Sequence, residues 1–179
     1  MPLAMNTPVE PAIRIEVSQI NRAPIEASGL ADGALLDLER DRFAHADGPI
    51  SWSFRLELVG PDILVSGSVS APLSLLCSRC ARFFSTSVRI SSFFRTYGWD
   101  EHPEVLDLSE DVREDVLLEI PGYPVCRPDC KGLCPQCGGN RNEVDCGCVP
   151  PELSGDASPW SALDQLKWGD APQGAAPDK

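Results

Sequence analysis

The stretch SWSFRLEL at residues 51–58 decides the fold class of this chain. Its apolar and polar side chains alternate strictly, which is typical of a strand with one face in a core and the other in water. After a turn at Gly60 and Pro61 the alternation continues over residues 63–69, and Pro72 separates this run from a third one. The pattern therefore predicts a meander of antiparallel strands.

Two further segments complete the predicted core. Residues 84–91 alternate again and are long enough to cross the whole sheet. Residues 101–120 carry eight acidic residues and one basic residue, and several of their apolar residues share one helical face. Ser109 suits the N-cap of this helix, and Pro121 with Gly122 ends it. We therefore expect one main, acidic helix after the strands.

These patterns predict an α+β, mainly β fold, with an antiparallel sheet or small open barrel, one main helix and a C-terminal cysteine-rich, zinc-binding appendage. The apolar residues between Trp160 and Leu166 indicate a short C-terminal helix. The expected divisions are an N-terminal strand and extension at 1–49, a β-rich core with the acidic helix at 50–125, a cysteine-rich zinc-binding segment at 126–150, and the short C-terminal helix with a disordered tail at 151–179.

The charge of the chain restricts the partners it can bind. The 179 residues include 15 basic and 27 acidic ones, which gives a net charge of −12. This charge repels polyphosphate at long range, so any contact with RNA must be local. The sequence contains neither a basic N-terminal region followed by an apolar run nor 18 consecutive apolar residues. We therefore expect a cytosolic protein.

The eight cysteines are the strongest chemical signal. In a reducing compartment, such a density indicates metal binding or redox chemistry rather than a disulfide framework. His45 and His102 lie far from them in sequence, so the expected metal ligands are Cys77, Cys80, Cys126, Cys130, Cys134, Cys137, Cys146 and Cys148. Sites closed by four thiolates are structural rather than catalytic, which predicts two zinc ions, with iron–sulfur clusters as the alternative.

The spacing leaves two ways to divide these cysteines between two metals. In one, Cys134, Cys137, Cys146 and Cys148 form a compact unit, which leaves Cys77, Cys80, Cys126 and Cys130 for the other site. In the other, the two C-x2-C pairs share one metal as in a zinc ribbon, so that Cys77 and Cys80 join Cys134 and Cys137. Spacing alone does not choose between them.

An ordered set of short motifs resembles a known family. CSRC at 77–80 closes a strand, LLEIP at 117–121 follows the acidic helix, and CKGLCPQCG at 130–138 precedes Asn142 and CGC at 146–148. Over about residues 50–168 the chain is similar to the YceD family of large-ribosomal-RNA-subunit accumulation proteins. The resemblance implies a bacterial cytoplasmic protein, also found in plastids, that is linked to large-subunit ribosomal RNA and encoded close to a ribosomal protein of that subunit.

The resemblance also bears on the division of the cysteines. Some family members keep a C-x2-C like that of Cys77 and Cys80, and metal-capable residues near the positions of Cys126 and Cys130. The same members lack the whole Gly-Leu-Cys-Pro segment. A segment that is absent as a unit from some members should bind its own metal ion, so the resemblance favours the first division.

The sequence supports a binding protein rather than an enzyme. It has no phosphate loop, no metalloprotease motif and no nucleophile elbow. A thiol-redox protein is the enzymatic alternative, but neither C-x2-C pair precedes a helix in a βαβ context. We therefore expect no catalytic residue and no small-molecule substrate.

Two kinds of partner fit the expected role. Arginine and aromatic residues interleave between 77 and 95 with no acid among them, which suits RNA contact by Arg79, Arg82, Phe83, Arg89 and Arg95. The competing interpretation is that these arginines line the solvated face of a strand. The expected RNA is a precursor of the large-subunit (23S) ribosomal RNA. The alternative is an adaptor whose acidic helix attracts a basic ribosomal or processing protein.

Overall fold

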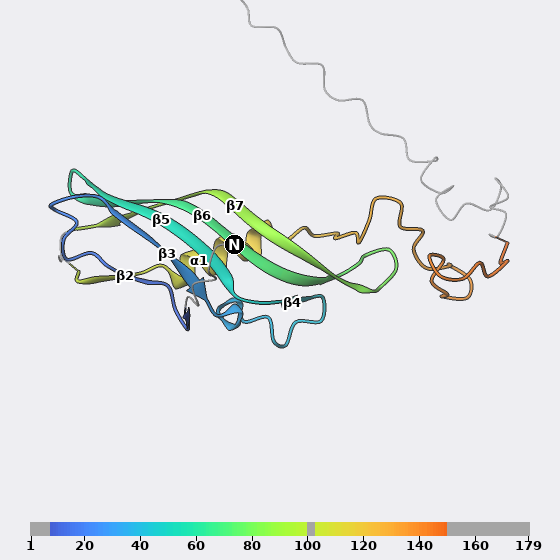
Figure 1. Ribbon diagram of the computed structural model, residues 1–179. Helices are drawn as coiled ribbons and strands as arrows, with labels where there is room; N and C mark the ends of the chain where they lie inside the picture. The colour runs from blue at the N-terminus through green and yellow to red at the C-terminus, as the bar shows by residue number, and fades with distance from the viewer. Residues whose placement is uncertain (1–7, 100–102, 150–179) are drawn as a thin grey trace, which may run out of the picture.

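The computed structural model describes residues 8–99 and 103–149 (Figure 1), and the C-terminal helix and tail predicted at 151–179 lie outside them. The described elements are β1 (Val9–Glu10), β2 (Arg14–Glu16), β3 (Ile25–Ala31), the 3-10 helix η1 (Gly33–Leu36), β4 (Ala44–Ala46), β5 (Ile50–Val59), β6 (Asp62–Leu76), β7 (Phe83–Gly98), β8 (Val105–Asp107) and α1 (Ser109–Glu119). The predicted mainly β fold with one main helix is confirmed.

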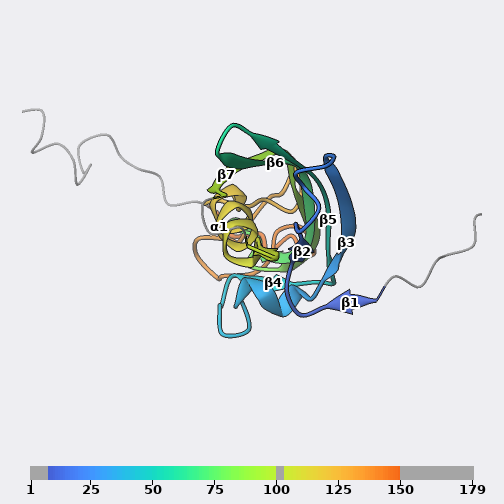
Figure 2. The same cartoon turned by 90° about the vertical axis from the view of Figure 1, so that its left-hand side faces the viewer.

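The main sheet curls around α1 as an open half-barrel (Figures 1 and 2). Its strands follow the order β1-β3-β5-β6, with β7 along the other edge of β6 and β4 continuing beside β6 beyond the start of β5. All of these pairings are antiparallel except that of β1 with β3. Strands β2 and β8 form a separate two-stranded sheet. The concave face of the main sheet thus encloses the core.

A bulge interrupts the pairing of β6 with β7 between Gly67 and Val69. Gly67 lies so close to β5 that a Cβ there would overlap the backbone oxygen of Ser53 and come within 2.7 Å of the Phe54 ring. Only glycine allows this approach. Because one extra residue inverts the alternation of side chains, the bulge changes which residues of β7 face the core.

Pro72 does not end a strand, contrary to the prediction. Strand β6 continues through it, and its partner on β7 is Ser87. On the opposite edge, the carbonyl of Pro72 accepts a hydrogen bond from Asp47 N (2.9 Å), in the interval between the end of β4 and the start of β5. A residue without an N–H breaks no ladder bond at such a gap, so proline is tolerated.

The region before residue 50 holds more structure than its pattern predicts. Strands β1 to β4 and η1 lie there, where the alternation indicates one strand and a loosely specified connection. These strands are short and rely on distant partners, since Ile15 pairs with Leu106 and β3 pairs with β5. Ile13 and Val17 are fully buried, so this segment is part of the core.

Helix α1 packs on the concave face through Val112 and Val116, which are fully buried. The prediction that Ser109 caps the helix is wrong, because its hydroxyl instead accepts a hydrogen bond from Ile13 N (2.9 Å). Asp111 and Asp115 pair with Arg95 of β7 and fasten the helix to the sheet. No helix in the described part of the chain has the length and apolar character to cross a membrane.

Candidate metal centres

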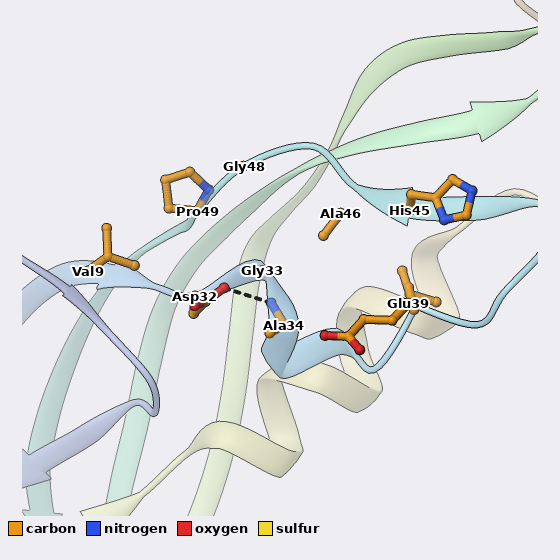
Figure 3. Close-up of a pocket in the computed structure, with 10 residues that line it drawn as sticks. Val9, Asp32, Gly33, Ala34, Glu39, His45, Ala46, Gly48 and Pro49 are labelled. Carbon is orange, nitrogen blue, oxygen red and sulfur yellow. Dashed lines mark hydrogen bonds between the residues drawn. The ribbon is translucent and has the colours of Figure 1, made fainter.

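A pocket of about 430 Å³ lies between η1 and β4 and contains Asp32, Glu39 and His45 (Figure 3). Asp32 accepts a hydrogen bond from Ala34 N (2.9 Å), and the His45 ring packs 5.0 Å from that of Phe83. Figure 3 shows Asp32 and His45 at opposite ends of the lining. These described residues form no acid–base pair, so the cysteines are the stronger candidates for function.

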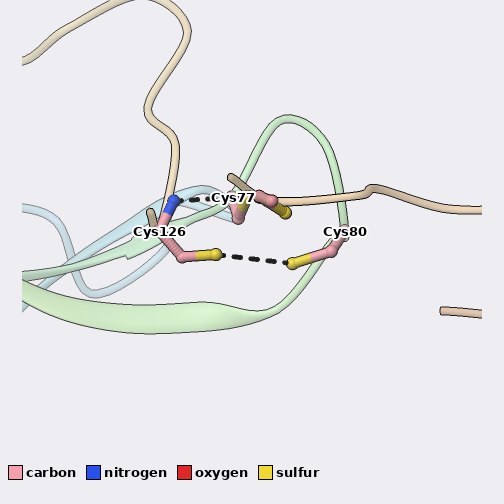
Figure 4. Close-up of side chains that lie close together, drawn as sticks. Cys77, Cys80 and Cys126 are labelled. Carbon is pink, nitrogen blue, oxygen red and sulfur yellow. Dashed lines mark hydrogen bonds between the residues drawn. The ribbon is translucent and has the colours of Figure 1, made fainter. Parts of the chain in front are cut away.

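The first cysteine group joins two segments that are distant in sequence. Cys77 directly follows β6, Cys80 lies in the loop to β7, and Cys126 and Cys130 follow α1. All four sulfur atoms lie within 4.8 Å of one another. The Sγ atoms of Cys77 and Cys130 are 3.9 Å apart, as are those of Cys80 and Cys126. Figure 4 shows Cys77, Cys80 and Cys126 turned toward a common point.

This geometry suits one tetrahedral ion. Metal–sulfur bonds of about 2.3 Å give a tetrahedron with edges of about 3.8 Å, close to the observed sulfur separations. Cys77, Cys80 and Cys130 are each at most 5% exposed, so an ion held there would be shielded from water. The residues present therefore fit a closed, structural metal site.

The second group consists of Cys134, Cys137, Cys146 and Cys148, whose sulfur atoms also lie within 4.8 Å of one another. All four come from one local segment, and Cys137 is exposed. The structure thus brings the eight cysteines together in the division that the family resemblance favours. The ribbon-like alternative would join thiols that belong to different groups.

The two C-x2-C pairs are built by the same turn. In the first, Cys77 N donates to Arg82 O (2.8 Å) and Ala81 N donates to Cys77 O (2.9 Å), with φ of 53° at Ala81. In the second, Gly138 N donates to Cys134 O (2.9 Å), with φ of 72° at Gly138. The residue after the second cysteine is left-handed in both, which costs a residue with a side chain about 1–2 kcal/mol.

The thiols within each group differ widely in pKa. Burial raises the pKa of the Cys77 thiol, but hydrogen bonds from nearby backbone N–H groups outweigh it and lower the pKa to about 6. Burial and the surrounding sulfur atoms instead raise the pKa of Cys126 to about 12. In the second group, backbone N–H donors lower the pKa of Cys134 to about 6, while Cys146 and other sulfurs raise the pKa of Cys148 to about 12. A divalent cation held by all four sulfurs of a group would let them ionise together.

Asn142 links the two groups, although no chemical feature of the sequence singles it out. It lies between the cysteines of the second group, yet its Nδ2 donates to Sγ of Cys130 in the first (3.4 Å). Its Oδ1 accepts from Lys131 N (2.9 Å) and from Arg127 Nη2 (2.8 Å). Asn140 in turn accepts a hydrogen bond from the Asn142 amide at 2.7 Å. Only the three-dimensional fold brings this side chain to the first group.

Arg79 and Arg82, both predicted to contact RNA, make contacts within the metal region. The guanidinium of Arg79 donates to the carbonyls of Pro128 (3.2 Å) and Cys130 (3.3 Å), and Arg79 O accepts from Leu133 N (2.9 Å). Arg82 forms an ion pair with Glu143 at 2.6 Å. These contacts hold the second group against the loop that bears Cys77 and Cys80.

The five predicted RNA-binding residues do not form one patch. Phe83 and Arg89 are exposed on β7. Arg95 points to the concave side, where it pairs with α1 and lies 5.4 Å above the Phe93 ring. Arg89 and Arg95 would share a face in a regular strand, but the bulge at Gly67 puts them on opposite faces.

Comparisons with known proteins place these features in context. Residues 65–167, more than half of the chain, match the family model described as "Large ribosomal RNA subunit accumulation protein YceD". An uncharacterized protein of Mycobacterium tuberculosis is 34% identical over 143 residues, 68% of this chain and 62% of the relative. A Zea mays protein named "Large ribosomal RNA subunit accumulation protein YCED homolog 1, chloroplastic" is 43% identical over 51 residues, 28% of this chain and 17% of its own. The chain thus spans less than two thirds of the length of these relatives, and no solved structure matches it.

Proposed function

Because this chain belongs to the YceD family of large ribosomal RNA subunit accumulation proteins, we propose that it is a non-enzymatic, zinc-binding factor of the bacterial cytoplasm. Its role is to support the synthesis, processing or accumulation of large-subunit (23S) ribosomal RNA. It binds two zinc ions, one in each group of four cysteines. The zinc ions are structural, because four thiolates leave no coordination position for water or substrate.

The observation that carries this proposal is the way the first cysteine group connects the core to the C-terminal segment. The loop at residues 77–82 extends from the long β6–β7 hairpin, and residues 126–130 follow the helix. Zinc held between them supplies folding free energy and fixes one end of the molecule. Binding of the metal is therefore coupled to the shape of the surface that a ribosomal partner would meet.

The test combines metal content with ribosomal RNA levels in cells. Full-length protein should contain close to two zinc ions per chain by elemental analysis and show no iron chromophore. Depletion should lower mature large-subunit RNA relative to small-subunit RNA, and Cys130→Ser should fail to restore it. Asp129→Ala changes an exposed neighbour and serves as the control, with normal zinc content and normal RNA. A metal-free protein with four disulfides, or unchanged RNA after depletion, would contradict the proposal.

An adaptor function is the second candidate, and one observation favours it. The exposed side of α1 carries Glu110, Glu114 and Glu119 next to Leu118, which is 76% exposed. A basic ribosomal or processing protein would be attracted to this face. Purification under reducing conditions separates the candidates, since direct RNA binding enriches RNA whereas an adaptor enriches basic proteins without RNA. A thiol-redox protein, purified instead without a reductant, would be recovered partly oxidised.

A further inference from the structure

Asp62, the first residue of β6, is the one acidic residue in the long hairpin formed by β6 and β7. Residues 63–98 contain neither aspartate nor glutamate, although the whole chain has 27 acids. The segment does contain four arginines. On a chain with a net charge of −12, this hairpin repels a polyanion less than the acidic helix α1 does.

The convex side of the hairpin and of β5 is covered by hydroxyl groups. The side chains that alternate with the buried ones include Ser53, Ser66, Ser68, Ser70, Ser87 and Ser91. Arg89 lies among them and is exposed, and it has no ion pair or side-chain hydrogen bond among the described residues. Arg55 on the same face is already paired with Glu26 at 3.0 Å. Arg89 is thus the cation available on this face.

Two hollows on this face form one continuous depression. A hollow of about 630 Å³ lies at the bulge beside Phe94, and one of about 290 Å³ lies beside Arg89. Both are lined by Ser53, Ser68 and Ser91, so they adjoin each other. Their sizes are near those of sites that hold small ligands or single bases.

An exposed aromatic ring stands at each end of the face. Phe94 is 58% exposed beside the larger hollow, and Phe83 is 47% exposed near the cysteine loop. The strand rise of about 3.3 Å per residue places them roughly 36 Å apart along β7. Exposed aromatics on a sheet, with a free arginine and hydroxyls between them, suit stacking of unpaired bases and contact with phosphates.

We propose that the convex face of β5, β6 and β7 binds single-stranded RNA. A base stacks on Phe94 over the larger hollow, Arg89 pairs with a phosphate, and the serine hydroxyls donate hydrogen bonds to neighbouring phosphate oxygens. The choice of RNA as the partner rests on the proposed function. It leaves out Arg95, which faces the core, and adds Phe94, which is not among the five predicted RNA-binding residues.

The experiment uses zinc-loaded, full-length protein and a labelled single-stranded RNA of mixed sequence, about 12 nucleotides long. Fluorescence anisotropy measures affinity at several salt concentrations. Arg89→Glu should weaken binding about 10-fold or more and reduce the salt slope by about 0.7 for each phosphate that the protein no longer neutralises. Phe94→Ser should weaken binding about 10-fold, as expected when one base no longer stacks, with little change in the slope.

Arg113→Glu on α1 is the matched control, since it makes the same change in charge on the other side of the sheet. It should bind RNA almost as the unmodified protein does, apart from a small long-range effect of net charge. Circular dichroism and zinc content establish that each variant is folded.

Three outcomes would overturn the inference. Equal weakening in Arg89→Glu and Arg113→Glu, with Phe94→Ser unchanged, would place RNA elsewhere. Absence of RNA binding by the unmodified protein would reject the face as an RNA site. Loss of self-association or of a bound basic protein in Phe94→Ser, without RNA binding, would assign the face to protein contact. The proposed function is tested separately, by the ribosomal RNA levels after depletion of the protein, and these three outcomes do not bear on that measurement.

Discussion

Replacing Asn142 by alanine should weaken zinc binding at the first cysteine group, although Asn142 is not one of its ligands. The change removes the hydrogen bond from Nδ2 to Sγ of Cys130 and the acceptor of Lys131 N. Outer-shell partners of metal ligands are typically worth 10–100-fold in metal affinity, or about 1.4–2.8 kcal/mol. Lys131 is exposed, so water can replace part of its missing hydrogen bond. We therefore expect the zinc affinity of the first cysteine group to fall about 10-fold, the low end of this range.

The assay is competition for zinc between the full-length protein and a chromophoric chelator. Zinc should leave in two phases, one for each cysteine group, and Asn142→Ala should shift the phase that Cys77→Ser abolishes. Asn142→Asp sharpens the test, because it keeps the acceptor for Lys131 N but puts an oxygen opposite the Cys130 sulfur. It should therefore weaken the first site at least as much as alanine does.

Arg141→Ala is the control, since Arg141 precedes Asn142 and is exposed. Within the described part of the chain, Arg141 makes one hydrogen bond, from its backbone N–H to Gly132 O, and this bond survives the substitution. It should release zinc as the unmodified protein does. If Asn142→Ala and Asn142→Asp both stayed within about twofold of the unmodified affinity, the linkage between the two sites through Asn142 would be refuted.

Three other changes test the fold and the metal sites. Gly67→Ala should lower the free energy of unfolding, measured in urea, by more than about 2 kcal/mol, because the new methyl group overlaps β5. Gly122→Ala is the control and should change the free energy of unfolding little, because the space around Gly122 is open. Gly138→Ala should lower the free energy of unfolding by about 1 kcal/mol without release of zinc. The strain comes from the positive φ alone, because nothing lies within 4 Å of the new methyl group. Release of the metal would refute this interpretation. Cys77→Ser should remove amide-exchange protection over residues 52–90. Cys146→Ser should leave that region protected and lower protection in the segment after residue 133. An equal effect in both variants would show that the two sites fold as one unit.

The sequence was most informative where one local pattern decided the outcome. Strict alternation identified β5, the inward side of β6 and the inward side of β7 as far as Ile90, and the grouped apolar residues with Pro121 identified α1. The alternation of Ile13, Ile15 and Val17 indicated a strand where β2 lies. Strands β1, β3 and β4 escaped because they are two to seven residues long and owe their existence to partners far away in the chain. Pro72 misled for a similar reason, since whether a proline interrupts a strand depends on what lies along its edge.

The site divides in the same way between local and distant information. The second cysteine group comes from one segment, and its spacing alone made it a candidate. The first group needs the loop after β6 and the segment after α1 to meet, which spacing could not show. The orientation of Arg95 depended on the bulge opposite Gly67, and a single inserted residue is invisible to a periodicity argument. The role of Asn142 depended on the packing of one cysteine loop against the other.

The first cysteine group also determines how the molecule would respond to mechanical force. With an ion bound, Cys77 and Cys80 are cross-linked to Cys126 and Cys130, so tension applied before β6 and after the second group passes through metal–thiolate bonds. Residues 81–125, which include β7 and α1, then lie on a closed loop that carries no load. Once the site has ruptured and β7 and α1 have detached from the core, this loop would add about 150 Å of extended chain. A translocating machine that pulls on one end of the protein would therefore encounter the metal before it could unfold the helix.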